Sequence, residues 1–150
     1  MPSPLISSLL ELLDEGFNKT AWHGPNLLAS IRRLDHETAS KVIVRGRKTI
    51  WEQVLHAAYW KQRVLNQLVG TERFPRSPAN WPRVPELATG EAWREDVALL
   101  VNIHVRLRRA VEGLREEELT PKLMKFIRGA AMHDVYHAGQ INLLKREMKG

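Results

Sequence analysis

The chain contains no cysteine, and this absence excludes several kinds of chemistry. Without a thiol there is no disulfide, no thiolate metal site, no iron–sulfur cluster and no cysteine nucleophile. Any metal must therefore be bound by histidine, aspartate, glutamate or water, and the six histidines are the main candidates. Any thiol that takes part in a reaction must come from a small-molecule cosubstrate.

Long hydrophobic runs and targeting signals are also missing. No stretch of about 18 consecutive apolar residues occurs, so a transmembrane helix and a membrane partner are not expected. Residues 1–4 (MPSP) lack the basic segment that opens a secretory signal peptide. We therefore expect a cytoplasmic protein.

The charge is unbalanced, because 23 Lys and Arg against 17 Asp and Glu give a formal net charge of +6. A basic domain can bind phosphate-rich partners by releasing counterions. Here the basic residues lie in short groups among acidic residues, and no nucleic-acid-binding motif is present. We interpret these groups as solvated helix faces and do not expect nucleic acid as a partner. A non-catalytic basic module that binds anions or nucleic acid is kept as an alternative function.

Length and periodicity predict a single all-α domain over residues 1–150, because 43% hydrophobic content can supply one core. No alternating pattern typical of strands, internal repeat or low-complexity segment competes with this interpretation. The pattern predicts long helices over residues 5–17, 49–70, 90–116 and 121–148, and short helical turns over residues 25–34 and 35–39. Four long helices predict a four-helix bundle.

Local signals mark the ends of these helices. Thr49 with Glu52 three residues later is a capping box, and Gly70 is a stop signal. Thr120 followed by Pro121 marks the start of the last helix. The segment 71–88 holds four prolines, which exclude regular helix and predict a long crossover loop (Pro75, Pro78, Pro82 and Pro85).

His133 and His137 lie four residues apart in the last predicted helix, so their imidazoles point the same way. Both share an arc with the apolar stripe of that helix and are expected to face inward. Buried imidazoles need hydrogen-bond partners or a metal, and such a pair can bind one transition-metal ion. Two core histidines that bond to neighbouring side chains or water are the alternative.

Periodicity does not identify a third ligand. His56 falls about 60° beyond the apolar arc of helix 49–70, which makes it a boundary residue. His104 is centred on the apolar stripe of helix 90–116. It could be a third ligand, a hydrogen-bond partner of a ligand or a core histidine, and the pattern leaves this choice open.

Three segments resemble the DinB-like (YfiT-like) family in their order and spacing: residues 22–28 (WHGPNLL), 49–60 (TIWEQVLHAAYW) and 133–141 (HDVYHAGQI). The loop at residues 80–82 (NWP) and the helix with Trp93 are also similar to members of this family. The pattern His-x-x-x-His-x-Gly-Gln-Ile is the most specific element, and the resemblance covers nearly the whole chain.

The resemblance implies a four-helix bundle in which His56, His133 and His137 bind one divalent ion, and it thereby favours His56 over His104. The ion associated with such proteins is nickel, zinc or iron, and family members are often homodimers. Some relatives are thiol-dependent enzymes, such as bacillithiol transferases and mycothiol-dependent maleylpyruvate isomerases. We therefore expect a metal-dependent transferase or hydrolase that acts on a small electrophilic substrate, with a low-molecular-weight thiol as a possible cosubstrate. The alternative is a non-catalytic, metal-stabilised bundle.

Two residues are weak candidates for catalysis. Glu52 could act as a general base, although its role in the capping box is favoured. Tyr59 could donate a hydrogen bond to substrate, as could Tyr136 and Gln140, although packing roles are at least as well supported.

Three further residues carry other expectations. Asp134 is expected to face solvent or an interface, because its angle is about 100° from that of His133. His23 lies at a helix break where Trp22 and Pro25 could lock the turn, so a structural role is favoured. Arg63 could attract an anionic substrate, although surface arginines are common.

Overall fold

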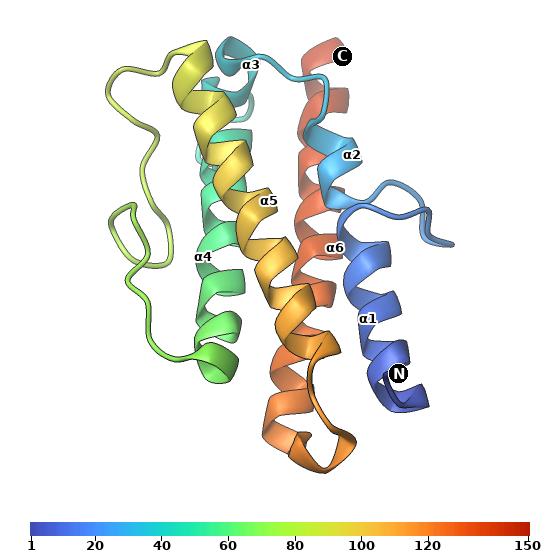
Figure 1. The fold of residues 1–150 in the computed structure, drawn as a ribbon. Coiled ribbons are helices and arrows are strands. Elements are labelled where there is room, and N and C mark those ends of the chain that lie inside the picture. Colours follow the sequence, from blue (N-terminus) through green and yellow to red (C-terminus); the bar gives the residue numbers. More distant parts are fainter.

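The computed structural model describes residues 1–150, and its regular elements are all helical. The long helices are α1 (Pro4–Phe17), α4 (Ile50–Val69), α5 (Gly90–Glu112) and α6 (Pro121–Lys149). The short helices α2 (Leu27–Ile31) and α3 (His36–Ser40) join α1 to α4, and a 3₁₀ turn at Glu116–Glu118 precedes α6. The long helices lie side by side (Figure 1), which confirms the predicted four-helix bundle.

The interior of the bundle is one continuous core. All 27 buried hydrophobic residues belong to a single cluster, to which each of the four long helices contributes. Helix α1 comes very close to α6 at Gly16, where an added Cβ would lie 2.8 Å from the carbonyl oxygen of Ala131. A side chain does not fit there, so glycine is required by the packing rather than by the local backbone.

Most helix ends are set by the local signals. Thr49 accepts a hydrogen bond from the Glu52 amide at 3.1 Å, and the Glu52 carboxylate accepts one from the Thr49 amide at 3.0 Å. Thr120 caps α6 in the predicted place. Helix α5 is shorter than predicted and ends at Glu112, because the next residue is Gly113, whose low helix propensity favours termination.

The helix break after α1 differs from its prediction. Pro25 does not open a helix; instead the Asn26 side chain caps α2 by accepting a hydrogen bond from the Ala29 amide at 2.9 Å. The turn is locked by Asn26, which donates to the carbonyl oxygen of Lys19 at 3.0 Å. Trp22 is fully exposed and cannot lock it, and His23 is exposed as well.

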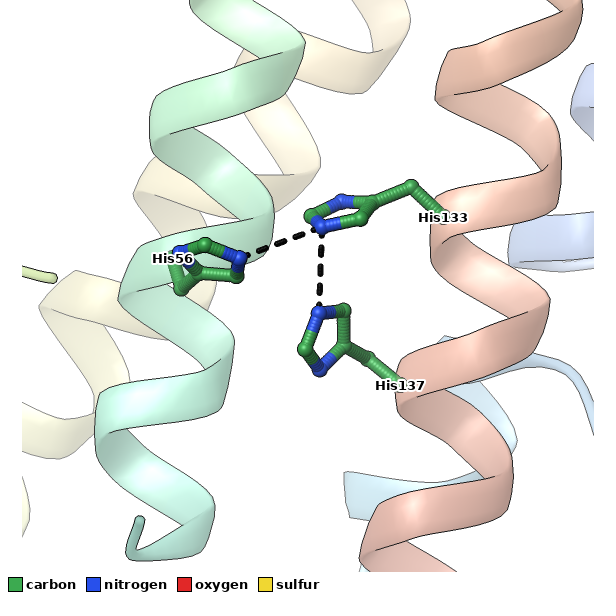
Figure 2. A group of neighbouring side chains, drawn as sticks. All are labelled: His56, His133 and His137. Atoms are coloured by element: carbon green, nitrogen blue, oxygen red, sulfur yellow. Dashed lines mark hydrogen bonds between the residues drawn. The ribbon is translucent and has the colours of Figure 1, made fainter. Parts of the chain in front are cut away.

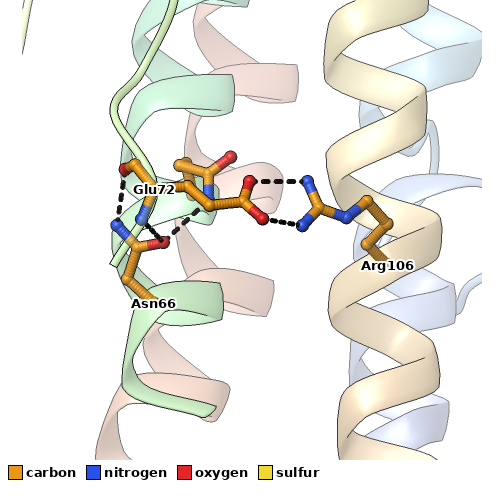
Figure 3. Close-up of polar contacts among 4 residues, drawn as sticks. Asn66, Glu72 and Arg106 are labelled. Carbon is orange, nitrogen blue, oxygen red and sulfur yellow. Dashed lines mark hydrogen bonds and ion pairs between the residues drawn. The ribbon is translucent and has the colours of Figure 1, made fainter. Parts of the chain in front are cut away.

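The predicted crossover loop runs from the end of α4 to the start of α5 along the outer side of α4 (Figure 1). Its first residues are tied to both helices, as Figure 3 shows: the Glu72 carboxylate accepts two hydrogen bonds from Arg106 of α5, and its backbone is held by Asn66 of α4. A second tie joins Arg76 to Asp96, which also accepts a hydrogen bond from Trp51 at 2.8 Å. These contacts hold the first part of the loop against α4 and α5.

No helix in this structure is both long enough and apolar enough to span a membrane.

Candidate metal centre

Three histidines from two helices converge in the bundle. His56 comes from α4, and His133 and His137 come from successive turns of α6 (Figure 2). The Nε2 atom of His133 lies 3.1 Å from the Nε2 atoms of both His56 and His137. The three candidate ligand atoms all lie within 4.8 Å of one another. A tetrahedral ion with nitrogen ligands about 2.0–2.1 Å away would hold those nitrogens about 3.3 Å apart, so the two spacings from His133 are close to what an ion requires.

Hydrogen bonds to the outer ring nitrogens set the tautomers of two rings. His56 Nδ1 donates to the carbonyl oxygen of Asn80 at 2.6 Å, and His137 Nδ1 donates to Oε1 of Gln53 at 2.9 Å. In the neutral rings both Nε2 atoms then carry lone pairs. His133 Nε2 carries at most one proton, so it can donate a hydrogen bond to only one of the two neighbouring Nε2 atoms. The lone pair of the other Nε2 atom would then face His133 Nε2 at 3.1 Å without a proton between them, which is repulsive. A cation shared by the three Nε2 atoms removes this repulsion.

The electrostatic surroundings keep these rings uncharged. Burial, reinforced by His56 and Lys61, lowers the pKa of His133 to about 4. Burial and the facing His133 and His56 lower the pKa of His137 to about 3. Burial also lowers the pKa of His56, although its bond to Asn80 opposes the shift. The neutral imidazole is the form that binds metals, so all three rings are in the ligand form at neutral pH.

The crossover loop completes the surroundings of His56. The indole of Trp81 stacks on the His56 ring, with centroids 3.7 Å apart and planes inclined by 7°. Asn80 adopts a φ of 70°, a left-handed conformation that asparagine tolerates better than most residues. Its side chain accepts a hydrogen bond from Trp60 Nε1 at 2.7 Å. Although periodicity made His56 a boundary residue, the loop covers it and leaves it only 7% exposed.

Sequence reasoning missed two groups that hold the histidines in place. Gln53 is buried beside His137. The sequence pattern that could have indicated this is the position of Gln53, a polar residue among the apolar residues of α4 and three positions before His56. The backbone carbonyl of Asn80 had no signal, because any residue carries a carbonyl group and only the path of the loop places this one.

Asp134 was predicted to face solvent or an interface, and this prediction was wrong. Its side chain is 1% exposed and forms an ion pair with Lys61 of α4, whose side chain is equally buried. Burial raises the pKa of the Asp134 carboxyl, while the Lys61 ammonium acts in the opposite direction. The error arose because α6 packs against α1 as well as α4, which widens its buried arc beyond one apolar stripe.

His104 lies outside the histidine cluster. Its ring stacks on Phe17 with centroids 3.9 Å apart, and its Nδ1 accepts a hydrogen bond from Lys61 at 3.3 Å. Burial, together with the charges of Lys61 and Arg108, lowers its pKa to about 2. Of the roles left open by periodicity, the structure favours a core histidine, because His56 takes the place beside His133.

The weak catalytic candidates have other contacts. Glu52 is engaged in its cap and lies 3.7 Å from Lys48, and it makes no hydrogen bond to the histidine cluster. The ring of Tyr59 packs edge-on against Trp60 and Phe74. Arg63 lies over the ring of Trp60, 6.0 Å from its centroid.

Two cavities flank the cluster. One, of about 520 Å³, lies between α4 and α6 and is lined by His133. The other, of about 610 Å³, is lined by His137, Trp81 and Gln53, and also by Tyr136 and Gln140. The cluster therefore has a cavity on each side, and each is large enough for a small molecule.

Comparison with known proteins gives one relationship. The family model of the DinB superfamily matches residues 19–143. Searches of curated proteins and of solved structures found no match. The matched range contains all three histidines of the cluster, so the site lies within the part of the chain that carries the family signal.

Proposed function

The chain belongs to the DinB superfamily, and from this premise we propose that it binds one divalent metal ion through His56, His133 and His137. The observation that carries the proposal is the convergence of three Nε2 atoms, two of which belong to rings whose tautomers are set by hydrogen bonds from outside the cluster. Imidazole nitrogens suit nickel, zinc, iron and copper, so the donor set does not select one ion; nickel, zinc and iron are the ions that the family resemblance implies.

We further propose that the metal site is catalytic. Three protein ligands are typical of catalytic sites, which keep a position open, whereas structural sites are usually closed by four. When bound, such an ion supplies Lewis acidity and lowers the pKa of water or of a thiol beside it. The contribution of the chain is to present three neutral imidazoles, to hold those of His56 and His137 in place through Asn80 and Gln53, and to cover His56 with Trp81.

The proposed reaction is transfer to, or hydrolysis of, a small electrophilic substrate. The two cavities beside His133 and His137 support it, since they provide separate space for an electrophile and for a thiol cosubstrate. The chain itself has no cysteine, so the thiol must be supplied as a small molecule. A homodimer is the proposed assembly, which the mass of the purified protein in solution tests.

Elemental analysis of purified protein tests the metal site. We expect about one nickel, zinc or iron per chain in the parent, and loss of most of it in each of the variants His56→Ala, His133→Ala and His137→Ala. His23→Ala is the matched control, because His23 is exposed and lies outside the cluster. Equal metal content in His56→Ala and the parent would remove His56 from the site.

Turnover tests the catalytic proposal separately. The metal-loaded protein is mixed with 2-mercaptoethanol and 1-chloro-2,4-dinitrobenzene, whose reaction forms a thioether and releases chloride and a proton. Hydrolysis is followed with 4-nitrophenyl acetate. We expect at least one reaction to be accelerated and the acceleration to be lost in His56→Ala. Metal binding without any acceleration of either reaction would favour the metal-stabilised bundle, and strongly salt-dependent binding of nucleic acid would favour the anion-binding module.

A further inference from the structure

One wall of the cavity of about 520 Å³ between α4 and α6 is formed by residues that recur at helical intervals along α6. Lys125, Gly129 and His133 follow one another at intervals of four residues and therefore lie on one face of the helix. Lys122 and Phe126 form a parallel row beside them. A molecule in this cavity would meet ammonium groups at one end and the histidine cluster at the other.

The hollow exists because small residues line its middle. Gly129 and Ala130 of α6 face Ala57 of α4 across the cavity. A Cβ built on Gly129 would have no heavy atom within 4 Å, so its missing side chain leaves open space. The rings of Trp60 and Phe126 supply flat apolar walls. Such walls favour an occupant with a flat apolar body.

The charge at the mouth of this cavity is positive. Lys122 and Lys125 are exposed and neither forms an ion pair with a carboxylate. Lys61 also lines the cavity, but Asp134 neutralises its charge. The net charge offered to an occupant therefore comes from the two exposed lysines.

We propose that this cavity binds the electrophilic substrate, and that this substrate is an aromatic or similarly flat apolar molecule that carries a carboxylate. The carboxylate lies at the Lys122 and Lys125 end, and the reactive end points toward His133. This assignment rests on the proposed function, because it takes the histidine cluster as the reactive centre.

Binding of 2-naphthoate to the zinc-loaded protein tests the assignment, with neutral 2-naphthamide as the comparison ligand. We expect saturable binding by calorimetry, with the carboxylate preferred by a few-fold to about tenfold, since two exposed lysines contribute modestly. The preference shrinks as salt is added. Equal affinity for the two ligands, or no saturable binding of either, would overturn the proposal.

Filling the cavity provides the second arm of the test. Gly129→Leu places a side chain in the open space and also raises helix propensity, so the variant is expected to fold. We expect its affinity for 2-naphthoate to fall at least tenfold while its zinc content stays that of the parent. Gly139→Leu is the matched control, because Gly139 lies on the same helix in equally open space but outside this cavity. An affinity of Gly129→Leu for 2-naphthoate equal to that of the parent would contradict the assignment of the cavity.

Removing the lysine charges provides the third arm. The double variant Lys122→Gln/Lys125→Gln is expected to bind naphthoate and naphthamide equally. The control Lys19→Gln/Lys41→Gln loses the same charge elsewhere on the surface and is expected to keep the preference. A preference that survives in the first double variant would show that the carboxylate binds elsewhere, for example to the zinc ion, and would overturn the proposal.

Zinc content is measured in every sample and separates the two proposals. A parent protein that binds no metal contradicts the proposed function, whatever its affinity for naphthoate. A parent that binds zinc but whose naphthoate affinity is indifferent to Gly129→Leu contradicts only the assignment of the cavity.

Discussion

The indole of Trp81 stacks on the ring of His56, with centroids 3.7 Å apart. The two residues are 25 positions apart in the sequence: His56 lies on α4, and Trp81 lies in the crossover loop. The contact makes the crossover loop an outer wall of the histidine cluster. The loop backbone also binds His56 through the carbonyl of Asn80. The same loop is bound to α5 nearer its start, where Glu72 pairs with Arg106.

Trp81→Ala is expected to weaken metal binding about tenfold, since groups that orient a ligand typically contribute about 10–100-fold to affinity. The physical reason is that removing the indole exposes the His56 ring, which then gains rotational freedom and contact with water. Competition with a chelator measures the affinity. Trp22→Ala is the control, because Trp22 is fully exposed. An affinity equal to that of the parent would show that the stack does not position His56.

Gln53→Leu is expected to weaken metal binding by about 10–100-fold, because His137 Nδ1 loses its acceptor and the ring its fixed tautomer. Gln53→Glu keeps an acceptor at the same place and is expected to restore most of the affinity. Gln67→Leu, an exposed position on the same helix, controls for the loss of an amide. If Leu and Glu at position 53 have the same effect, the hydrogen bond to His137 is not the cause.

Metal removal is expected to lower the thermal unfolding midpoint without unfolding the bundle at room temperature, because the apolar core is continuous without an ion. A ligand at about 100 times its Kd stabilises the folded state by about 2.7 kcal/mol. For a chain of this length that corresponds to about 5–10 °C. Calorimetry with and without a chelator measures the shift. A shift of the same size in His56→Ala would place the bound metal elsewhere.

Acid is expected to destabilise the metal-free protein. His104, His133 and His137 have folded-state pKa values of about 2, 4 and 3, below the ordinary value of 6.5. Below pH 6.5 the unfolded chain therefore binds protons that the folded chain does not, so stability is full above this pH and falls as pH drops. Each histidine contributes about 1.4 kcal/mol per pH unit, so the three together reach about 4 kcal/mol per unit. The raised pKa of Asp134 offsets part of this loss at the acid end.

Denaturant unfolding at pH 7, 6 and 5 measures that slope. His23→Ala, which removes an exposed histidine, is expected to show the parental slope. A free energy of unfolding that does not change between pH 7 and pH 5 would contradict the buried, neutral state of these rings.

Gly16→Ala is expected to destabilise the fold by about 1–3 kcal/mol, a usual cost of overpacking. The added methyl group would lie 2.8 Å from the backbone oxygen of Ala131, so α1 and α6 must move apart. Gly139→Ala is the matched control, since it lies in a helix with open space and is expected to stabilise by about 1 kcal/mol. Urea unfolding compares them, and equal stability of Gly16→Ala and the parent would show that the contact yields easily.

The amino-acid sequence alone was enough to predict the four long helices, the Thr49 and Thr120 caps, and the shared orientation of His133 and His137. These features depend on hydrogen bonds and spacings within a few residues, which the order of side chains determines. At the break after α1 the local signals competed, and Asn26 rather than Pro25 starts the helix.

Tertiary structure decided the features that depend on distant segments. His56 is buried because the loop places Trp81 on it, and no periodicity of α4 contains that information. Asp134 is buried because α1 approaches α6 at Gly16 while α4 supplies Lys61 on the other side. The hydrophobic pattern of a helix predicts one buried face. The actual burial of a side chain depends on every element that packs around it. Helical spacing therefore identified two histidines of the cluster and the family resemblance implied the third, His56, whose place beside them is decided by the packing of α4, α6 and the loop.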